Sequence, residues 1–181
     1  GKAGGFVSAP IYASVSGTVK KINQAVASSG RLMQTVVIES DGEQTLLEEL
    51  HPPKLDTMQD FLDAVRESGL VGLGGAGFPT VVKLTVKNLE QVKAVIINGA
   101  ECEPYITSDT RTMLDRSQEV LEGARLVQHF LQVKRVIFAI EDNKPFCVRT
   151  YRKLVKDELG MEVCPLKSLY PQGGEKVLIY N

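Results

Sequence analysis

Four glycines within six consecutive positions, in the middle of the chain, predict its local structure more strongly than any other feature. The glycines of this block are Gly72, Gly74, Gly75 and Gly77. Glycine lets consecutive backbone N–H groups turn toward one side and form an anion-binding concavity, and a helix that begins next to it adds its positive end. Pro79 suits the first turn of such a helix, and Lys83 lies about one turn further on. The block therefore predicts a phosphate-binding loop, with a tight-packing turn as the alternative.

The spacing of three of these glycines also matches the dinucleotide fingerprint G-x-G-x-x-G. That fingerprint needs a buried strand before the first glycine and an acidic residue about 20 positions later, at the end of the next strand. Residues 57–68 instead show the apolar spacing of a helix. Asp56 or Thr57 would cap its start, and Gly69 would end it in the left-handed conformation. The next predicted strand ends on Asn98, so we reject a Rossmann site and predict a helix–loop–helix phosphate site.

Helical and strand patterns alternate from residue 57 onward. We predict helices over 57–68, 79–88, 116–131 and 145–159, strands over 93–98 and 135–140, and an extended segment over 161–164. Such alternation predicts an α/β fold in which a parallel sheet is covered by helices. Residues 1–50 carry short β-rich runs and predict a small all-β unit, which ends at the stiff segment His51-Pro-Pro-Lys54. The expected division is therefore 1–50 and 51–181, with the second part cut short at its C-terminal end.

The charge balance and the cysteine count exclude several classes of protein. Lys and Arg number 21 against 22 Asp and Glu, which gives a net charge of −1 without a basic cluster, so nucleic acid is not an expected partner. No apolar run approaches the ~20 residues that cross a bilayer, so we expect no direct membrane span. Cys102, Cys147 and Cys164 are too far apart for a metal site, and we predict that Cys147 and Cys164 pack in the core.

A second motif, Asn98-Gly-Ala-Glu-Cys-Glu-Pro-Tyr105, follows a predicted buried strand, where open α/β sheets bind their ligands. Pro104 disfavours helix at Glu103, so we expect an extended segment in which Glu101 and Glu103 project to the same side. Carboxylates only accept hydrogen bonds and suit sugar or ribityl hydroxyls and ring N–H donors, whereas Asn98 supplies both a donor and an acceptor. A solvated loop and a paired general acid and base are the alternatives.

A third motif, Tyr170-Pro-Gln-Gly-Gly-Glu-Lys176, is predicted to form a tight turn that opens a helix. Glu175 would lie in the first turn of that helix, and Gly173 or Gly174 would permit a close backbone approach to a flat group. With the other two motifs, it predicts a pocket lined by glycine, carboxylate and one lysine.

Taken together, the three motifs resemble the C subunit of the Rnf ion-translocating electron transport complexes, which is related to the FMN- and NADH-binding flavoprotein subunit of respiratory complex I. The resemblance rests on Gly69–Leu84, Ile97–Ile106 and Tyr170–Lys176. Residues 9–22 also resemble the start of the barrel-sandwich hybrid unit of that family, with a structural role. The expected fold is therefore a flavoprotein-like α/β domain after a β-rich, barrel-sandwich-like unit, in the N-terminal part of a longer subunit.

The resemblance implies that the chain binds FMN non-covalently and uses NADH as a substrate. The cofactor-binding residues that it implies are Gly72, Gly74, Gly75, Gly77, Lys83, Asn98, Glu101, Glu103, Tyr170, Gly173 and Glu175. For NADH it implies Phe78, Glu103 and Glu175, with Phe78 as the aromatic ring that stacks on the dinucleotide. No catalytic side chain and no metal ligand is implied within these residues, because the flavin carries the chemistry.

The implied activity is hydride transfer from NADH to the flavin, followed by single-electron steps to 4Fe–4S centres outside this chain and then to ferredoxin, or the reverse. The implied partners are NADH and the other subunits of the membrane complex, and the implied location is peripheral, on the cytoplasmic side of the bacterial inner membrane. Two alternatives remain open. One is a docking or scaffold fragment of that subunit, and the other is a related flavin-dependent cobalamin reductase.

Overall fold

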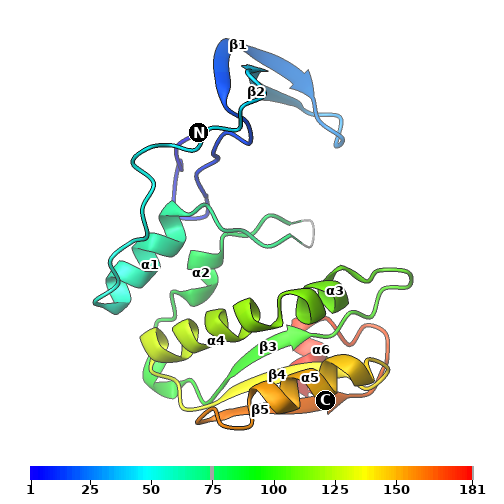
Figure 1. Cartoon of the computed structure of the whole chain (residues 1–181). Helices are drawn as coiled ribbons and strands as arrows, with labels where there is room; N and C mark the ends of the chain where they lie inside the picture. The colour runs from blue at the N-terminus through cyan, green and yellow to red at the C-terminus, as the bar shows by residue number, and fades with distance from the viewer. Residues whose placement is uncertain (74–75, 181) are drawn as a thin grey trace. The chain divides into compact units, whose positions relative to one another are not determined.

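The structure, a computed structural model, describes residues 1–73 and 76–180 and divides into two compact units, Gly1–Thr85 and Val86–Asn181 (Figure 1). The glycine block lies in the first unit, whereas the second and third motifs lie in the second. The division into domains 1–50 and 51–181 stays a prediction.

The first unit begins with an antiparallel hairpin of β1 (Gly17–Val26) and β2 (Leu32–Ser40). The pairing shifts between Val19 and Lys21, as expected where one strand carries an extra residue. The predicted β-rich start is therefore confirmed.

Helix α1 (Met58–Glu67) begins where the sequence predicts it. The Thr57 hydroxyl oxygen accepts a hydrogen bond from the Asp60 amide at 3.1 Å, and the Asp60 carboxylate accepts one from the Thr57 amide at 2.8 Å. This capping box satisfies two amides that a helix start leaves without partners. Beyond the helix, Gly69 has φ 71°, and an added Cβ would lie 2.7 Å from the Pro10 carbonyl oxygen. Both predicted ends of the helix are thus confirmed.

Helix α2 (Thr80–Leu84) is shorter than the predicted helix over 79–88. Val71 and Pro79 form an isolated antiparallel bridge, which holds Pro79 extended, with ψ 126°, just before the helix. At the other end, Thr85 leaves the helix with ψ 83°, and a short 3₁₀ turn (Leu89–Gln91) follows. The expectation that Pro79 lies in the first helical turn is therefore wrong, because the bridge to Val71 takes precedence over local preference.

The second unit is built on a parallel sheet with the strand order β3 (Val95–Gly99), β4 (Val136–Glu141), β5 (Met161–Leu166). Its helices are α3 (Ser108–Asp115), α4 (Ser117–Leu131), α5 (Pro145–Leu154) and α6 (Glu175–Tyr180). The predicted parallel sheet covered by helices is confirmed.

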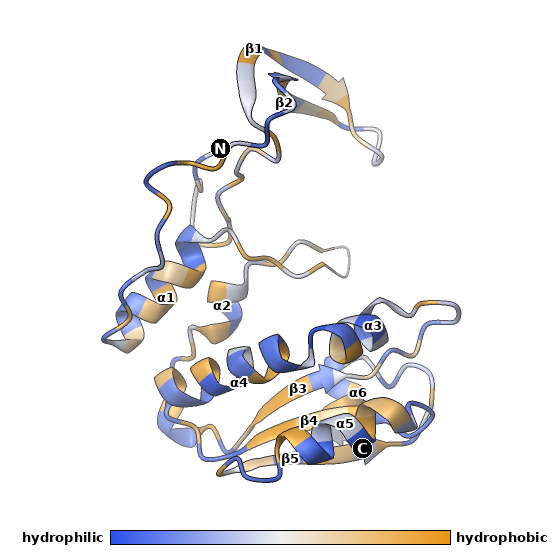
Figure 2. Cartoon of the chain, in the orientation of Figure 1, coloured by the Kyte–Doolittle hydropathy of each residue, from blue (hydrophilic) through white to orange (hydrophobic). Residues whose placement is uncertain are grey.

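The central strand β4 is buried and supports helices on both faces of the sheet. Phe138 packs against Tyr151 of α5, with ring centroids 4.9 Å apart. The next residue, Ala139, lies in one core cluster with Leu178 of α6. Because successive strand residues point to opposite faces, α5 and α6 cover different faces of the sheet. Figure 2 shows the corresponding apolar band along β3 and β4, with α3, α4 and α5 together on one side.

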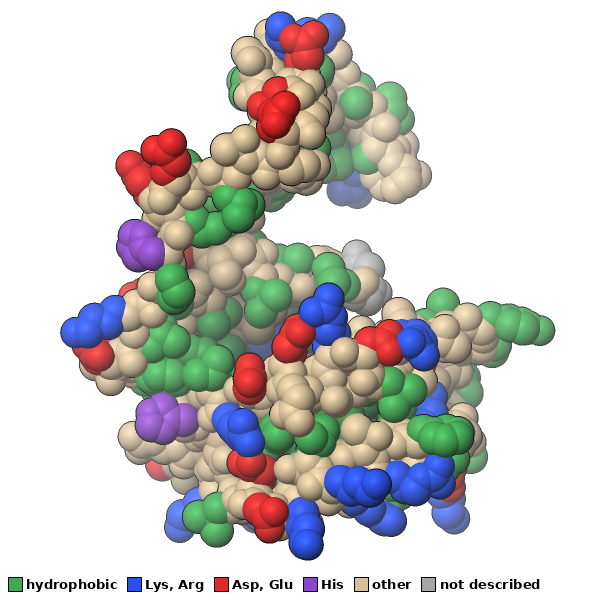
Figure 3. Space-filling model, viewed as in Figure 1, with side chains coloured by type: hydrophobic (Ala, Val, Ile, Leu, Met, Phe, Trp, Pro, Cys, Tyr) green, Lys and Arg blue, Asp and Glu red, His purple; other side chains and the backbone are tan. Residues whose placement is uncertain are grey.

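Two helices and one cysteine differ from the predictions. Helix α3, whose one buried apolar residue is Met113, was not predicted from the sequence. Helix α5 ends at Leu154 rather than at residue 159, and turns lead to Gly160. Its outer surface carries several basic side chains, which gather over this helix in Figure 3. Cys147 is buried as predicted, but Cys164 on β5 is exposed.

Replacing Gly160 by alanine is expected to lower the free energy of unfolding by about 1–3 kcal/mol. Gly160 has φ 76°, and an added Cβ would collide with the Lys134 carbonyl oxygen. Gly123→Ala is the matched control, because Gly123 lies within α4 with open space around it. This substitution should raise the free energy of unfolding by about 0.5–1 kcal/mol. Urea denaturation of both variants measures the difference, and effects of the same sign would contradict the backbone conformation at Gly160.

Candidate functional site

The carboxyl ends of the three parallel strands surround an open cleft of roughly 380 Å³. The segments that line it follow β3, β4 and β5, the position at which open α/β sheets bind ligands. The residues of the cleft are Glu101, Cys102, Glu103, Pro104, Tyr105, Ile106, Thr107, Glu141, Asn143, Lys144, Ser168, Leu169 and Tyr170. The structure therefore brings together the predicted residues Glu101, Glu103 and Tyr170.

Glu101 is buried, and its side chain is 1% exposed. One carboxylate oxygen accepts a hydrogen bond from the Asp109 amide at 2.7 Å, and the other accepts from the Thr110 hydroxyl at 2.6 Å and the Thr110 amide at 3.3 Å. These amides belong to the first turn of α3, so Glu101 caps a helix that begins seven residues later. Its carboxylate is engaged within the protein.

Glu103, in contrast, is exposed, and the chain turns directly after it. The Ile106 amide donates to the Glu103 carbonyl oxygen at 3.3 Å, and Tyr105 has a left-handed φ of 66°. Glu101 and Glu103 line the same cleft, but one is buried and the other exposed. That both project to the same side of an extended segment stays a prediction. Hydrogen bonds to α3 draw Glu101 inward and leave Glu103 as the accessible carboxylate.

The surroundings of Glu101 and Asp109 shift the pKa values of these two carboxyl groups in opposite directions. Burial opposes the ionised form of Glu101, but the Thr110 hydroxyl, the Asp109 amide and Lys144 outweigh it and hold the pKa of Glu101 below its usual 4.5. Burial, followed by the charge of Glu101, raises the pKa of Asp109 above its usual 3.8. The buried carboxylate thus stays charged at neutral pH.

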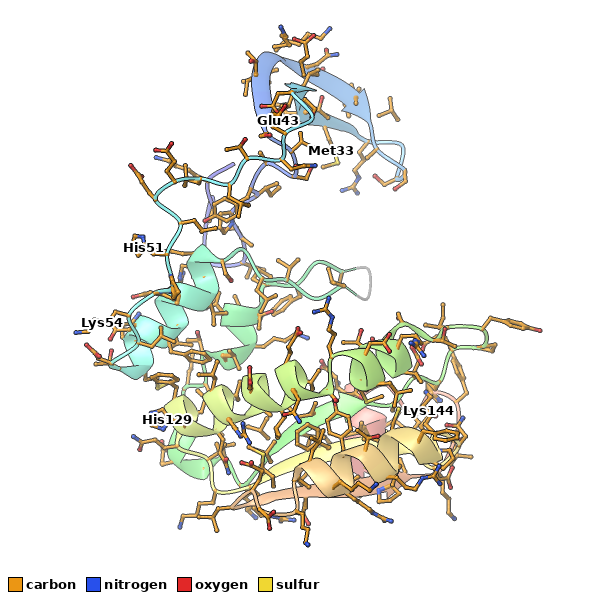
Figure 4. The ribbon with its side chains drawn as sticks, viewed as in Figure 1. Met33, Glu43, His51, Lys54, His129 and Lys144 are labelled. Atoms are coloured by element: carbon orange, nitrogen blue, oxygen red, sulfur yellow. The ribbon has the colours of Figure 1, made fainter. Side chains whose placement is uncertain are left out.

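The end of β4 and the turn after it supply two charged residues that were not predicted from the sequence, Glu141 and Lys144. The Lys144 ammonium lies 3.0 Å from the Glu141 carboxylate and donates to the Glu101 carbonyl oxygen at 3.0 Å. Figure 4 shows Lys144 at the start of α5, at the carboxyl end of the sheet. The rule that places ligand sites after parallel strands could have identified both residues, because they follow a strongly predicted strand.

Asn98 joins the second motif to the third. Its amide nitrogen donates to the Gly173 carbonyl oxygen at 2.9 Å, and its amide oxygen accepts from the Ala100 amide at 3.2 Å. The Gly173 amide in turn donates to the Cys102 sulfur at 3.3 Å. A Cβ at Gly173 would lie 3.1 Å from the Ala100 carbonyl oxygen, so the close approach expected there is to the second motif. Glu175 lies in the first turn of α6, as predicted.

The glycine block lies in the first unit, and Gly74 and Gly75 fall outside the described residues. The Gly72 amide donates to the Phe78 carbonyl oxygen at 2.9 Å, so this N–H group is used within the loop. Gly77 has φ 58° and open space at its Cβ position. Lys83 is exposed on α2. That this block and Glu103 share one cavity stays a prediction.

Clusters of metal-ligating side chains and long apolar helices are both absent from the described ranges, 1–73 and 76–180. No group of three or more His, Cys, Asp or Glu side chains there could hold a metal ion. Within the same ranges, every helix is too short or too polar to span a bilayer.

Known protein families match both ends of the chain. A model of the Nuo51 FMN-binding domain matches residues 65–181. The chain belongs to the Nuo51 FMN-binding domain family. A model of the RnfC barrel sandwich hybrid domain matches residues 1–43, which include the β1–β2 hairpin. The match to the Nuo51 FMN-binding domain includes the glycine block and both motifs of the second unit.

Three curated relatives extend this comparison, and each is the C subunit of an oxidoreductase complex. The chain is 40% identical to that of the Na(+)-translocating ferredoxin:NAD(+) oxidoreductase complex of Acetobacterium woodii, over 99% of the chain and 41% of the relative. It is 40% identical to that of the proton-translocating ferredoxin:NAD(+) oxidoreductase complex of Clostridium ljungdahlii, over 98% of the chain and 39% of the relative. For the ion-translocating oxidoreductase complex of Haemophilus influenzae, the identity is 39% over 99% of the chain and 28% of the relative.

These matches confirm the resemblance to the Rnf C subunit that the three motifs predict. The chain spans about two fifths or less of the length of these curated relatives. It is related to components of electron transport complexes and carries a match to an FMN-binding oxidoreductase domain.

The cap of α3 by Glu101 predicts a pH-dependent effect of Thr110→Val. Because the pKa of Glu101 is lower in the folded state, the ionised carboxylate stabilises the fold fully above pH 4.5. This stabilisation is lost as the pH falls through the folded-state pKa. Removal of the Thr110 hydroxyl should lower the free energy of unfolding by about 1–2 kcal/mol at pH 7. The difference from wild type should become smaller below about pH 4. Urea denaturation from pH 3 to 7 measures it.

Thr112→Val is the matched control on the same helix. Its hydroxyl donates to the Ser108 carbonyl oxygen at 2.9 Å, so its effect should not change with pH. Parallel pH profiles of the two variants would refute the assigned role of Glu101.

Proposed function

We propose that this chain supplies the FMN-binding, NADH-oxidising part of a membrane-bound, ion-translocating electron transport complex. One observation carries the proposal, namely the match of residues 65–181 to a single FMN-binding domain that includes all three motifs. The names of the relatives favour this function over a flavin-dependent cobalamin reductase.

The glycine block fits the phosphate end of FMN. Backbone N–H groups and a lysine are the donors that a phosphate requires, and the open space at Gly77 leaves room for its approach. We assign the phosphate to the amides of Gly74, Gly75 and Gly77 and to Lys83. Gly72, whose amide is already used, would lie beside the flavin.

The cleft of the second unit fits the hydroxyl-bearing parts of FMN and NADH. Exposed Glu103 is an acceptor-only group, and Tyr170 offers a ring and a hydroxyl. Glu101 and Asn98 have partners within the protein, so we propose that they shape the loop that presents Glu103. For NADH we propose stacking on Phe78, which is 38% exposed, and contact with Glu175 at the start of α6.

FMN, when bound, would accept a hydride from NADH and release the electrons singly to iron–sulfur centres outside these residues. The chain's own residues bind and orient the two ligands, so we propose no catalytic side chain. The proposed partners are the other subunits of the complex, and the proposed location is peripheral, on the cytoplasmic side of the bacterial inner membrane. Ferredoxin is the proposed final acceptor, or the donor if electrons flow in reverse.

Lys83→Glu is expected to weaken FMN binding about tenfold or more, because it replaces a charge-assisted contact to phosphate by repulsion. Titration of the purified chain with FMN, followed by the visible absorption of the flavin, measures the affinity. Lys87→Glu makes the same charge change on a nearby exposed residue and should bind like wild type. Equal binding by Lys83→Glu and wild type would end the phosphate assignment.

A docking or scaffold fragment predicts a different result in the same titration. Wild-type chain would then remain colourless and give no flavin signal at any FMN concentration. That outcome would reject the proposed function as a whole rather than the role of Lys83 alone.

Glu103→Gln is expected to retain FMN but to raise the NADH concentration needed for flavin bleaching about tenfold, because a charged acceptor is lost. Anaerobic titration with NADH, followed by loss of flavin absorption, measures this change. Glu122→Gln, on the exposed surface of α4, is the control. If Glu103→Gln matches wild type, Glu103 does not contact NADH.

A further inference from the structure

The backbone of Glu101 is held on both sides by one ion pair. Its amide donates to the Glu141 carboxylate at 3.1 Å, and its carbonyl oxygen accepts from the Lys144 ammonium at 3.0 Å. Glu141 and Lys144 lie 3.0 Å apart at the two ends of a single turn, which the Lys144 amide closes onto the Glu141 carbonyl oxygen at 3.1 Å. The ion pair therefore holds the two peptide groups on either side of the Glu101 Cα, in the loop after β3.

This ion pair is almost completely removed from water. The side chains of Glu101 and Glu141 are 1% and 2% exposed, and that of Lys144 is 13% exposed. Lys144 also lies 3.4 Å from the Glu101 carboxylate, so one cation serves two buried carboxylates. A buried ion pair adds little net stability compared with apolar residues of the same volume. Its physical contribution here is the fixed geometry of the two peptide groups that it holds.

The other titratable groups nearby do not replace Lys144. Asp109 of α3 and Glu103 of the loop after β3 add negative charge near this cluster, and the Cys147 thiol of α5 has its pKa raised by burial. Two buried carboxylates without Lys144 would therefore repel each other with no second cation beside them among the described residues.

We propose that Lys144 is a positioning residue that, paired with Glu141, fixes the backbone at Glu101 and so sets where Glu103 stands in the cleft. Glu103 follows Glu101 by two residues, and Glu103 and Lys144 line the same cleft. The choice of NADH as the ligand of Glu103 rests on the proposed function. The effect of the ion pair on the loop does not, and it can be measured without any ligand.

The first experiment measures amide hydrogen exchange in the ligand-free chain. Lys144→Met should speed exchange of residues 101–105 about tenfold or more, while α4 keeps its wild-type rates. Lys153→Met, an exposed lysine on α5, is the control and should leave both regions unchanged. Unchanged exchange at 101–105, or an equal increase throughout the second unit, would overturn the inference.

The second experiment separates positioning from general stability through rescue by a conservative variant. In Lys144→Met, two buried carboxylates share no cation, so amide protection of residues 101–105 should fall. The double variant Glu141→Gln with Lys144→Met removes one carboxylate together with the cation and should regain part of that protection. Lys144→Arg keeps the cation and should restore wild-type protection. Protection in Lys144→Arg as low as in Lys144→Met would contradict the proposal.

The third experiment connects the ion pair to the ligand. In anaerobic titrations at saturating FMN, Lys144→Met should raise the NADH requirement about tenfold. If the loop loosens but the NADH requirement does not change, Lys144 is not a positioning residue. If wild-type chain binds no FMN, the proposed function fails, and the exchange profiles alone decide the role of Lys144. Should Lys144→Met fail to fold, Glu141→Gln replaces it, with faster exchange expected at 101–105.

Discussion

The burial of the Glu101 carboxylate is the interaction on which the candidate site depends. A charge removed from water needs several partners, and Glu101 obtains them from the first turn of α3 and from Lys144. Those partners come from two separate parts of the chain, one after β3 and one after β4. The hydrogen bonds and the ion pair of this one carboxylate therefore connect the start of α3 with the loops after β3 and β4, at the carboxyl edge of the sheet.

The same edge shows a division of roles among polar residues. The side chains of Glu101 and Asn98 form hydrogen bonds within the protein, whereas Glu103 is exposed at the cleft. Asn98 connects this loop to Gly173, so the third motif is held by the second. A ligand in the cleft would meet a loop whose backbone is fixed before binding, which lowers the entropy lost on association.

Several features follow from local chemistry and could be predicted from the sequence. Thr57 and Asp60 cap α1 through their own side chains, and the apolar spacing that precedes Leu131 marks α4. The buried run of β4 and its alternation with helices predict the parallel sheet. The failures involve partners that lie outside the helix concerned. The cap of α3 comes from Glu101, and the bridge of Val71 to Pro79 delays and shortens α2.

The sequence by itself determined the α/β class, the order of most elements and the three motifs that identify the family. These depend on residue type, spacing and backbone preference, which are properties of neighbouring residues. Only the tertiary structure decided that Glu101 is buried, that Glu103 is accessible and that Glu141 and Lys144 belong to the site. The reason is that burial and ion pairing depend on which loops meet at the edge of the sheet, and the pairing of β3 with β4 brings residues 101 and 144 together.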